Sequence, residues 1–265
     1  MKFLYLGDIM GDLGIRSLRV YLKTTIEDHK IDFVLAQGEN VDNGKGISVQ
    51  QYLELKKLGV DFFTGGNWSL FNPEIYPYLN DPKEPIIRPA NYPKSYEGLG
   101  YKYLKTTRGQ VLVISVLGRI VGRDLKVNFK NPLKTVDDIL AAEQNVPRIA
   151  TIINFHGDYS SEKVIIGHYF NGRVTAVIGD HWHVPSNDAR LLDAKTAYIS
   201  DVGMNGSLNS SLGVKLDIAI KRWLNDAKLK NELVKNDKLQ FNGVVIDFST
   251  KTGLAKSIKQ IRIVS

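Results

Sequence analysis

Two histidines separated by one residue follow an apolar run of strand length. The run covers residues 174–178, and His181 and His183 come directly after Gly179 and Asp180. If the run is a strand that continues, side chains two positions apart point to the same face and could share one polar target. Imidazole is a common metal ligand, although a single spacing of this kind also arises by chance. The pair predicts a metal site only if other strand ends carry matching ligands.

Apolar runs of strand length alternate along the chain with amphipathic segments of helical spacing. The predicted strands are residues 2–6, 33–36, 60–64, 101–106, 111–116, 149–155, 174–178, 239–248 and 254–264. The predicted helices are residues 15–29, 48–58, a short one beginning at Asn72-Pro73, 136–144, 160–169 and 214–225. Ser48 with Gln51 resembles a capping box, and Ser160 or Ser161 could cap a later helix. This order predicts an α/β sandwich with mixed sheets, formed as a single domain over residues 1–265.

Polar side chains capable of binding metal stand just past five of the predicted strands, where open α/β sheets place their ligands. Each has a purely structural explanation on its own, such as a helix cap, a turn or a satisfied buried histidine. Their order, carboxylate then amide then imidazole at successive strand ends, is harder to explain in that way. The residues are Asp8, Glu39, Asn40, Asn67, His156, His181 and His183.

The composition limits what kind of site these residues can form. The chain has 265 residues and no cysteine, so disulfides and thiolate metal sites are excluded and any metal must be held by nitrogen and oxygen. Asp8 interrupts the apolar amino terminus, and no window approaches the roughly 20 apolar residues of a membrane span. We therefore expect a cytoplasmic protein without a membrane segment.

The formal net charge of +7 raises the question of an anionic partner. Basic residues are spread along the whole chain, and acids interleave with them in the densest stretch, residues 228–238. A solvated surface, a nucleic-acid surface and a phosphate-bearing substrate are all compatible with this charge.

The residues at the strand ends resemble those of the YmdB-like bacterial metallophosphoesterases, a branch of the calcineurin-like superfamily. The resemblance covers nearly the whole chain and includes residues 88–93, 161–163, 197–204 and 243–247. It implies a four-layer α/β/β/α sandwich with a dinuclear centre, often of iron or manganese, that hydrolyses phosphodiesters including cyclic nucleotides. By position, the resemblance assigns Asp8, Glu39, Asn40 and His183 to one metal. It assigns Glu39, Asn67, His156 and His181 to the other, so that Glu39 bridges the two ions.

The residue types suit this chemistry. Two divalent cations about 3.5 to 4 Å apart can hold a bridging hydroxide as nucleophile and bind the phosphoryl oxygens during in-line transfer. Nitrogen and oxygen ligands suit manganese, iron, zinc or cobalt, and the histidines argue against a pure magnesium or calcium site. Asp180 could orient a ligand imidazole or cap its own loop.

Two positions depart from the superfamily pattern. Met10 stands where a further histidine ligand is usual. Trp68 stands directly after Asn67, where the superfamily has the histidine that protonates the leaving group, and an indole cannot supply that proton at neutral pH. The residue that protonates the leaving group is therefore unknown, and we expect protonation of the leaving group to be weakened. Trp68 and Trp182 either pack locally or stack on a nucleobase.

Three basic residues are candidates for contact with substrate. Lys45 lies between glycines, close to the predicted strand end that carries Glu39, and is the candidate substrate-binding residue. Arg119 and Arg123 flank Gly122 in a loop-like segment and could face phosphate or only water.

The sequence therefore predicts a dinuclear-metal phosphodiesterase or phosphatase that acts on a cyclic nucleotide or a similar diester. One alternative is a regulatory RNA-binding protein of the same fold with vestigial hydrolysis. Another is an oligomeric interaction protein, such as a homo-oligomer, in which metals only stabilise loops.

Overall fold

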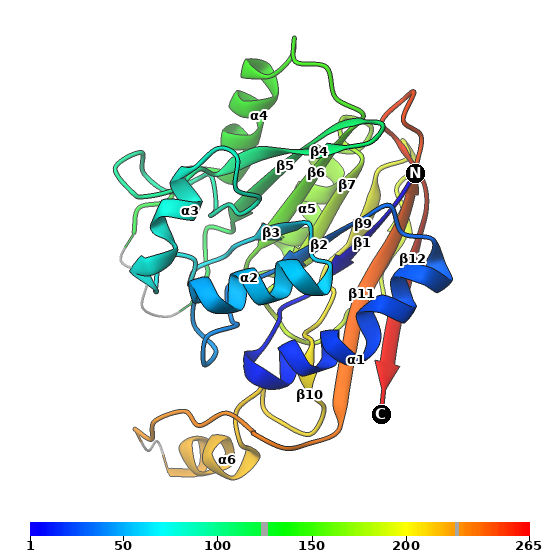
Figure 1. The fold of residues 1–265 in the computed structure, drawn as a ribbon. Coiled ribbons are helices and arrows are strands. Elements are labelled where there is room, and N and C mark those ends of the chain that lie inside the picture. Colours follow the sequence, from blue (N-terminus) through cyan, green and yellow to red (C-terminus); the bar gives the residue numbers. More distant parts are fainter. Residues whose placement is uncertain (123–126, 226–227) are drawn as a thin grey trace.

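Two mixed sheets of six strands each form the centre of the computed structural model, which describes residues 1–122, 127–225 and 228–265 (Figure 1). The first sheet has the order β10-β11-β1-β2-β3, with β12 beside β11. Its strands are β1 (Lys2–Leu6), β2 (Phe33–Gln37), β3 (Phe62–Thr64), β10 (Gly206–Ser207), β11 (Leu239–Phe248) and β12 (Ala255–Val264). The second sheet has the order β4-β5-β6-β7-β9-β8. Its strands are β4 (Tyr101–Thr106), β5 (Gly109–Leu117), β6 (Ala150–His156), β7 (Ala176–Asp180), β8 (Arg190–Leu191) and β9 (Ala197–Ile199).

Side-chain alternation along the strands explains how the layers stack. In β1, Phe3 and Tyr5 point into an apolar core that they share with residues of the second sheet, including Val113. Leu4 and Leu6 point the other way and pack against the helices. A third cluster joins the second sheet to its own helices. Each sheet is therefore apolar on both faces, and three cores hold four layers together.

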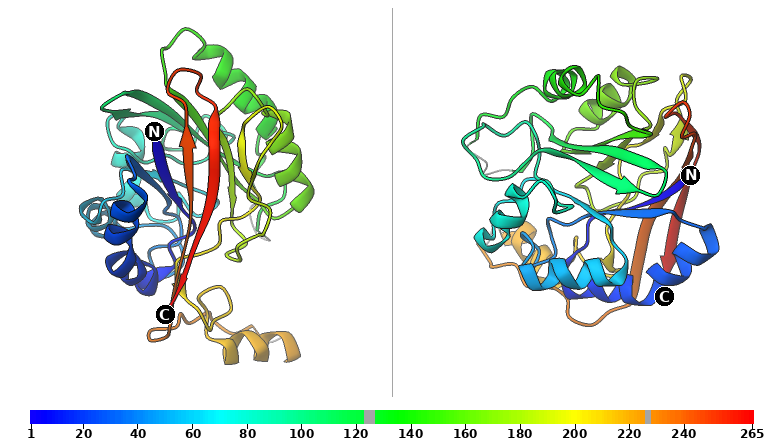
Figure 2. Two further views of the ribbon diagram at one scale, coloured as in Figure 1. Left: turned by 90° about the vertical axis from the view of Figure 1, so that its right-hand side faces the viewer. Right: turned by 45° about the horizontal axis from the view of Figure 1, so that its top comes forward.

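Helices cover the outer face of each sheet (Figure 2). The helices are α1 (Gly11–His29), α2 (Val49–Leu58), α3 (Tyr76–Asn80), α4 (Pro132–Ala142), α5 (Ser160–Tyr169) and α6 (Leu216–Asn225), with a 3-10 turn η1 (Pro73–Ile75) before α3. Residues of α1 and α2 belong to the core on the first sheet, and residues of α4 and α5 to the core on the second. The predicted α/β/β/α sandwich is confirmed. Helix α6 lies outside the four layers and has no buried residue.

Most predicted elements form, with shifted boundaries. The capping box at Ser48 and Gln51 is present at the start of α2. Helix α1 begins at Gly11, four residues before its predicted start. Strand β3 begins at Phe62, two residues after its own predicted start. The predicted serine cap of α5 is wrong, because Ser160 is already helical and Tyr159 precedes it without a side-chain cap.

His181 and His183 lie just past a strand end, as predicted, but strand alternation does not set their directions because neither residue is on the strand. Strand β7 ends at Asp180, and His181 and His183 follow it with φ angles of 100° and 62°. Both residues lie in the left-handed half of φ space, which a side chain with a Cβ rarely enters. Their directions are therefore set by the loop and not by strand alternation.

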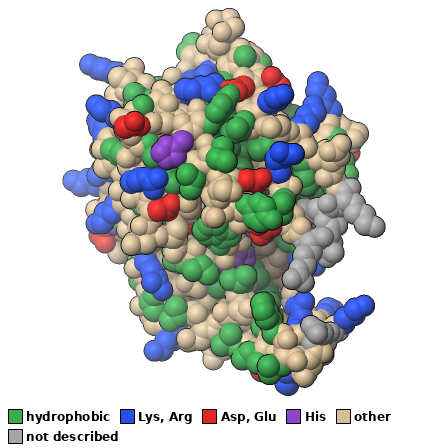
Figure 3. Space-filling model, turned by 180° about the vertical axis from the view of Figure 1, so that it is seen from behind, with side chains coloured by type: hydrophobic (Ala, Val, Ile, Leu, Met, Phe, Trp, Pro, Cys, Tyr) green, Lys and Arg blue, Asp and Glu red, His purple; other side chains and the backbone are tan. Residues whose placement is uncertain are grey.

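Charged side chains are dispersed over the surface. Figure 3 shows lysines and arginines distributed around one face of the molecule, with acidic side chains among them. Among the described residues, no helix has both the length and the apolar character that crossing a membrane requires.

Candidate metal centre

Parallel strands from both sheets deliver the predicted ligands to a common site. Strands β1, β2 and β3 run parallel to one another, as do β6 and β7, so their carboxyl ends lie together within each sheet. Contacts of His156 with Glu39 and of His183 with Asp8 join the two sheets there. The first sheet supplies Asp8, Glu39, Asn40 and Asn67, and the second supplies His156, His181 and His183.

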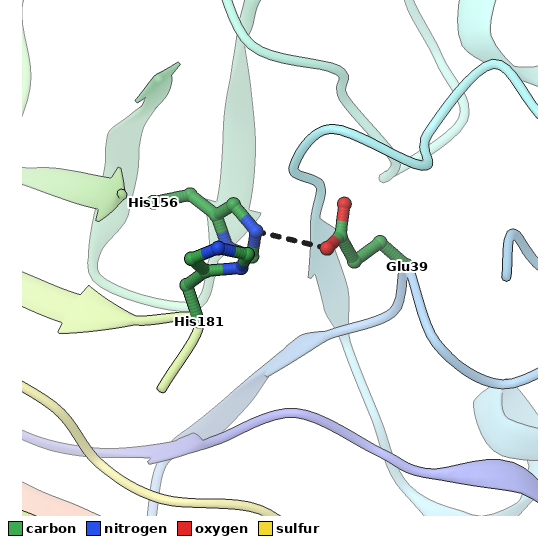
Figure 4. A group of neighbouring side chains, drawn as sticks. All are labelled: Glu39, His156 and His181. Carbon is green, nitrogen blue, oxygen red and sulfur yellow. Dashed lines mark ion pairs between the residues drawn. The ribbon is translucent and has the colours of Figure 1, made fainter. Parts of the chain in front are cut away.

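One group of ligand candidates surrounds the imidazole of His156 (Figure 4). Its Nε2 lies 2.8 Å from Oε1 of Glu39 and 2.9 Å from Oδ1 of Asn67. The ring of His181 lies 4.3 Å away, centroid to centroid. One ligand atom each from Glu39, His156 and His181 falls within 4.8 Å of the other two. Two oxygens and two imidazoles thus converge on a point that suits a cation with mixed ligands.

Asp180 fixes how His156 presents its ring nitrogens. Nδ1 of His156 lies 2.7 Å from Oδ1 of Asp180, while Tyr5 and Asn154 donate to Oδ2 of the same carboxylate. Nδ1 therefore carries the proton, and Nε2 faces Glu39 and Asn67. Burial alone lowers the pKa of His156, but the charge of Glu39 and the hydrogen bond to Asp180 outweigh it and raise the pKa well above its usual value. The surroundings of Nε2 favour a positive charge.

A second group contains buried polar atoms without hydrogen-bond partners. Nε2 of His183 lies 3.7 Å from Oδ1 of Asp8. Within the described residues, Oδ1 of Asp8, Oδ1 of Asn40 and Nδ1 of His183 are three of five buried side-chain atoms that lack any hydrogen-bond partner. Such atoms are rare in native structures, because each one costs desolvation free energy that nothing offsets.

The electrostatics of this second group also fit a cation. Burial and then the nearby Asp180 carboxyl raise the pKa of Asp8 well above its usual value. Burial, and then the neighbouring His181, lower the pKa of His183 to about 3, so its ring is neutral and retains a lone pair. A cation is a suitable partner for a buried carboxylate oxygen, an amide oxygen or a neutral imidazole nitrogen, which are the three kinds of atom left unpartnered here.

Glycine is required at one position for these groups to approach. A Cβ on Gly66 would lie 2.4 Å from Oε2 of Glu39 and 2.5 Å from Nε2 of His156. Real Cβ atoms essentially never approach other atoms so closely. The backbone after β3 therefore passes directly against the carboxylate and the imidazole, and only glycine leaves room for both.

Trp68 and Lys45 lie beside this centre. The backbone N–H of Trp68 donates to Oε2 of Glu39 at 2.7 Å. Its half-buried ring packs edge-on against Phe71, and Nζ of Lys45 lies 4.2 Å from the ring centroid. In this structure Trp68 packs against its neighbours, and the exposed ammonium of Lys45 is held over the indole by a cation–π contact.

Trp182 and Arg119, which were also named from the sequence, form hydrogen bonds with residues outside the candidate ligand set. The indole of Trp182 donates to the backbone carbonyl of Asp158. Arg119 is exposed, and its backbone N–H donates to Glu162. Arg123 lies outside the described residues.

Asp158, Lys163 and Asp201 were not predicted from the sequence, whereas Asp180 was expected to orient a ligand imidazole or to cap its own loop, and it does the former. Oδ1 of Asp158 lies 3.1 Å from Nε2 of His181. Asp180 orients His156 and not the adjacent His181, because strand pairing sets it directly beside His156. Lys163 and Asp201 form a buried ion pair behind the histidine loop. The stretches 161–163 and 197–204 were noted in the sequence, but no spacing within them indicates that they meet.

Known proteins resemble this chain over nearly its whole length. Residues 4–261 match the family model described as YmdB-like protein. The chain is 34% identical over 264 residues to the 2',3'-cyclic-nucleotide 2'-phosphodiesterase of Bacillus subtilis, covering 99% of this chain and 97% of that protein. The crystal structure of a novel phosphatase from Mycoplasma pneumoniae superposes with a TM-score of 0.92 at 29% identity, covering 100% of this chain and 93% of that one.

A more distant structural neighbour shows the fold alone. A 5'-nucleotidase precursor from Thermus thermophilus has a TM-score of 0.59 at 14% identity, covering 100% of this chain and 54% of that one. The fold is that of the calcineurin-like metallophosphoesterases. On the family match over nearly its whole length, the chain belongs to the YmdB-like protein family.

Proposed function

We propose that this protein is a metal-dependent phosphoric ester hydrolase that cleaves phosphodiesters with two metal ions. The observation that carries the proposal is the pair of adjacent groups at the sheet ends. Three buried polar atoms lack partners in one group, and two oxygens converge on a histidine nitrogen in the other. The activity named for the Bacillus subtilis relative supports ester hydrolysis.

The residues divide between the two ions as follows. Asp8, Asn40 and His183 would hold one ion together with Glu39. Asn67, His156 and His181 would hold the other, also with Glu39, whose carboxylate would bridge the pair. When bound, such ions supply Lewis acidity to phosphoryl oxygens and lower the pKa of coordinated water. Iron or manganese is favoured, and zinc or cobalt also suits nitrogen and oxygen ligands.

The protein's own residues position these ligands and the substrate. Asp180 keeps the Nδ1 proton of His156 in place, so that Nε2 would be the nitrogen that holds the ion. The N–H of Trp68 orients the Glu39 carboxylate from outside. We assign Lys45 as a contact for the anionic substrate, since its exposed ammonium lies on the indole beside the centre.

The substrate class follows from what the site contains and what it lacks. Trp68 occupies the position of the superfamily's leaving-group acid and cannot donate a proton to an alkoxide. A 2',3'-cyclic nucleotide, the substrate named for the Bacillus subtilis relative, is a strained diester and suits such a site. We therefore assign cyclic nucleotides or similar diesters as substrates.

The test is hydrolysis by metal-free protein that has been reloaded with Mn²⁺ or Fe²⁺. We expect metal-dependent turnover of bis(p-nitrophenyl) phosphate and of 2',3'-cyclic AMP, with at least about a hundredfold loss in Glu39→Gln. Fully loaded protein that turns over neither diester would overturn the proposal. Salt-sensitive binding of RNA that persists in Glu39→Gln, without hydrolysis, would favour the regulatory alternative.

A further inference from the structure

Lys163 is a charged residue buried behind the histidine loop, and the proposed reaction does not use it. Its side chain extends from α5 and is 1% exposed. Nζ donates to the backbone carbonyl of Asp180, the residue immediately before His181, and forms an ion pair with Oδ2 of Asp201 at 3.2 Å. The same ammonium lies 4.4 Å from the ring centroid of Trp182. A single lysine thus contacts the beginning and the middle of the loop that carries both histidines.

Asp201 continues this connection to the opposite side of the loop. Its Oδ2 accepts the N–H of Trp182 at 2.8 Å, and its Oδ1 accepts the N–H of Gly203 at 2.9 Å. One residue further along, the N–H of Met204 donates to the carbonyl of His183. The buried carboxylate therefore binds backbone groups on two segments that together enclose the histidine loop.

The same segment also contacts the strand end that carries Asp8. A Cβ on Gly7 would lie 1.7 Å from the carbonyl oxygen of Gly203, so the two backbones are in direct contact. The N–H of Asn205 donates to the carbonyl of Asp8 at 2.8 Å. The position of Asp8 relative to the histidine loop consequently depends on the segment that Asp201 holds.

The loop needs such support because its backbone is strained. His181 and His183 both have positive φ angles, and a residue in that region persists only when its surroundings determine it. We propose that Lys163 and Asp201 are positioning residues that hold the histidine loop so that His181 and His183 each reach a different metal ion. The inference rests on the proposed dinuclear site and adds to it a support that touches neither metal nor substrate.

A buried ion pair also affects folding, so the test must separate positioning from stability. Lys163→Met removes the charge at similar volume, and Asp201→Asn keeps the shape but removes the charge and replaces one acceptor oxygen with an NH₂ group. Lys102→Met is the matched control: Lys102 is also buried, at 4% exposed, and donates to the backbone carbonyls of Tyr78, Asp81 and Glu84, none of which belongs to the metal centre.

The readout is Co²⁺ and Mn²⁺ affinity of the metal-free proteins, together with the visible absorption spectrum of the Co²⁺ forms. We expect Lys163→Met and Asp201→Asn to lose about 10- to 100-fold in affinity for at least one ion and to show an altered Co²⁺ spectrum. Lys102→Met should lower the unfolding midpoint and keep the affinity and spectrum of the unsubstituted protein. If Lys163→Met does not fold, Asp201→Asn decides the question alone.

Two outcomes contradict the proposal in distinguishable ways. If both site variants bind the ions like the unsubstituted protein, or if Lys102→Met loses affinity to the same degree, the pair serves only the stability of the fold. If the unsubstituted protein itself binds no metal, the proposed function has failed, and the positioning role fails with it.

Discussion

Gly66 lies so close to the candidate ligands that any side chain at this position would disturb them. A methyl group there would collide with Glu39 and with Nε2 of His156. Gly66→Ala should therefore push these two groups apart and weaken binding of the ion they share by at least about tenfold. The check is Mn²⁺ affinity by calorimetry. Gly38→Ala is the control, because its Cβ would meet nothing nearer than a ring carbon of Phe63 at 3.2 Å. Equal affinities in the two variants would show that the close approach is unimportant.

A single substitution at Trp68 tests whether the site lacks a group that protonates the leaving alkoxide. The N–H of Trp68 holds Glu39, which any residue but proline could do, so Trp68→His preserves that contact and adds a group able to protonate an alkoxide. We expect turnover of a diester with a poor leaving group to rise at least about tenfold, since a positioned acid contributes about 10²- to 10⁴-fold. Turnover of an activated aryl diester should change little.

Metal content must be measured in parallel for Trp68→His. An unchanged rate on the poor-leaving-group diester, with unchanged metal content, would refute the account of the missing acid.

At the scale of elements, patterns in the sequence predicted the strands and their ends but not how distant segments meet. The pattern correctly placed Asp8, Glu39, Asn67 and His156 at or just past the carboxyl ends of their strands. This worked because side-chain alternation and strand length are local properties of the sequence. The loop after β7 was not predictable. Its conformation depends on Asp201, which lies 19 residues after Trp182, and on Lys163 from a different element.

Lys102 on β4 allows a prediction about stability and pH. Burial lowers the pKa of Lys102 to about 8, whereas an unfolded lysine keeps its proton to about pH 10.4. Between these values the unfolded chain binds more protons, so the contribution of Lys102 to the free energy of unfolding rises with pH. Lys102→Met should be destabilised by about 2 kcal/mol at pH 7, since it leaves buried carbonyls without a donor.

The measurement for Lys102→Met is guanidinium unfolding at pH 7 and pH 9.5. The gap in unfolding free energy between the two proteins should widen at the higher pH. A gap that is constant or shrinks would mean that the ammonium is not destabilised by burial.

At the scale of the whole molecule, the proposed ions would join the two sheets. The ligands of the first sheet come from the ends of β1, β2 and β3, and those of the second from β6 and the loop after β7. Resemblance to the family predicted the four-layer fold from these ligand positions and short stretches elsewhere. The spacing predicted helix α6, but neither it nor the resemblance predicted that this helix stands apart from the layers with its apolar residues exposed.

Because the proposed ions would join the two sheets, we predict that metal binding stabilises the fold. Ions present at a hundredfold excess over their dissociation constant add about 2.7 kcal/mol to the free energy of unfolding. Removing them with a chelator should therefore lower the melting temperature by several degrees, and adding Mn²⁺ back should restore it. Glu39→Gln should show a much smaller shift. Equal shifts in both proteins would mean that the stabilising ions bind elsewhere.

The central claim is that hydrolysis depends on two ions held together by Glu39. The most direct measurement is titration of metal-free protein with Mn²⁺ while hydrolysis of 2',3'-cyclic AMP is followed. We predict that turnover saturates at about two equivalents of metal per chain, as a two-metal mechanism requires. Saturation at a single equivalent, or no turnover at full loading, would contradict the account.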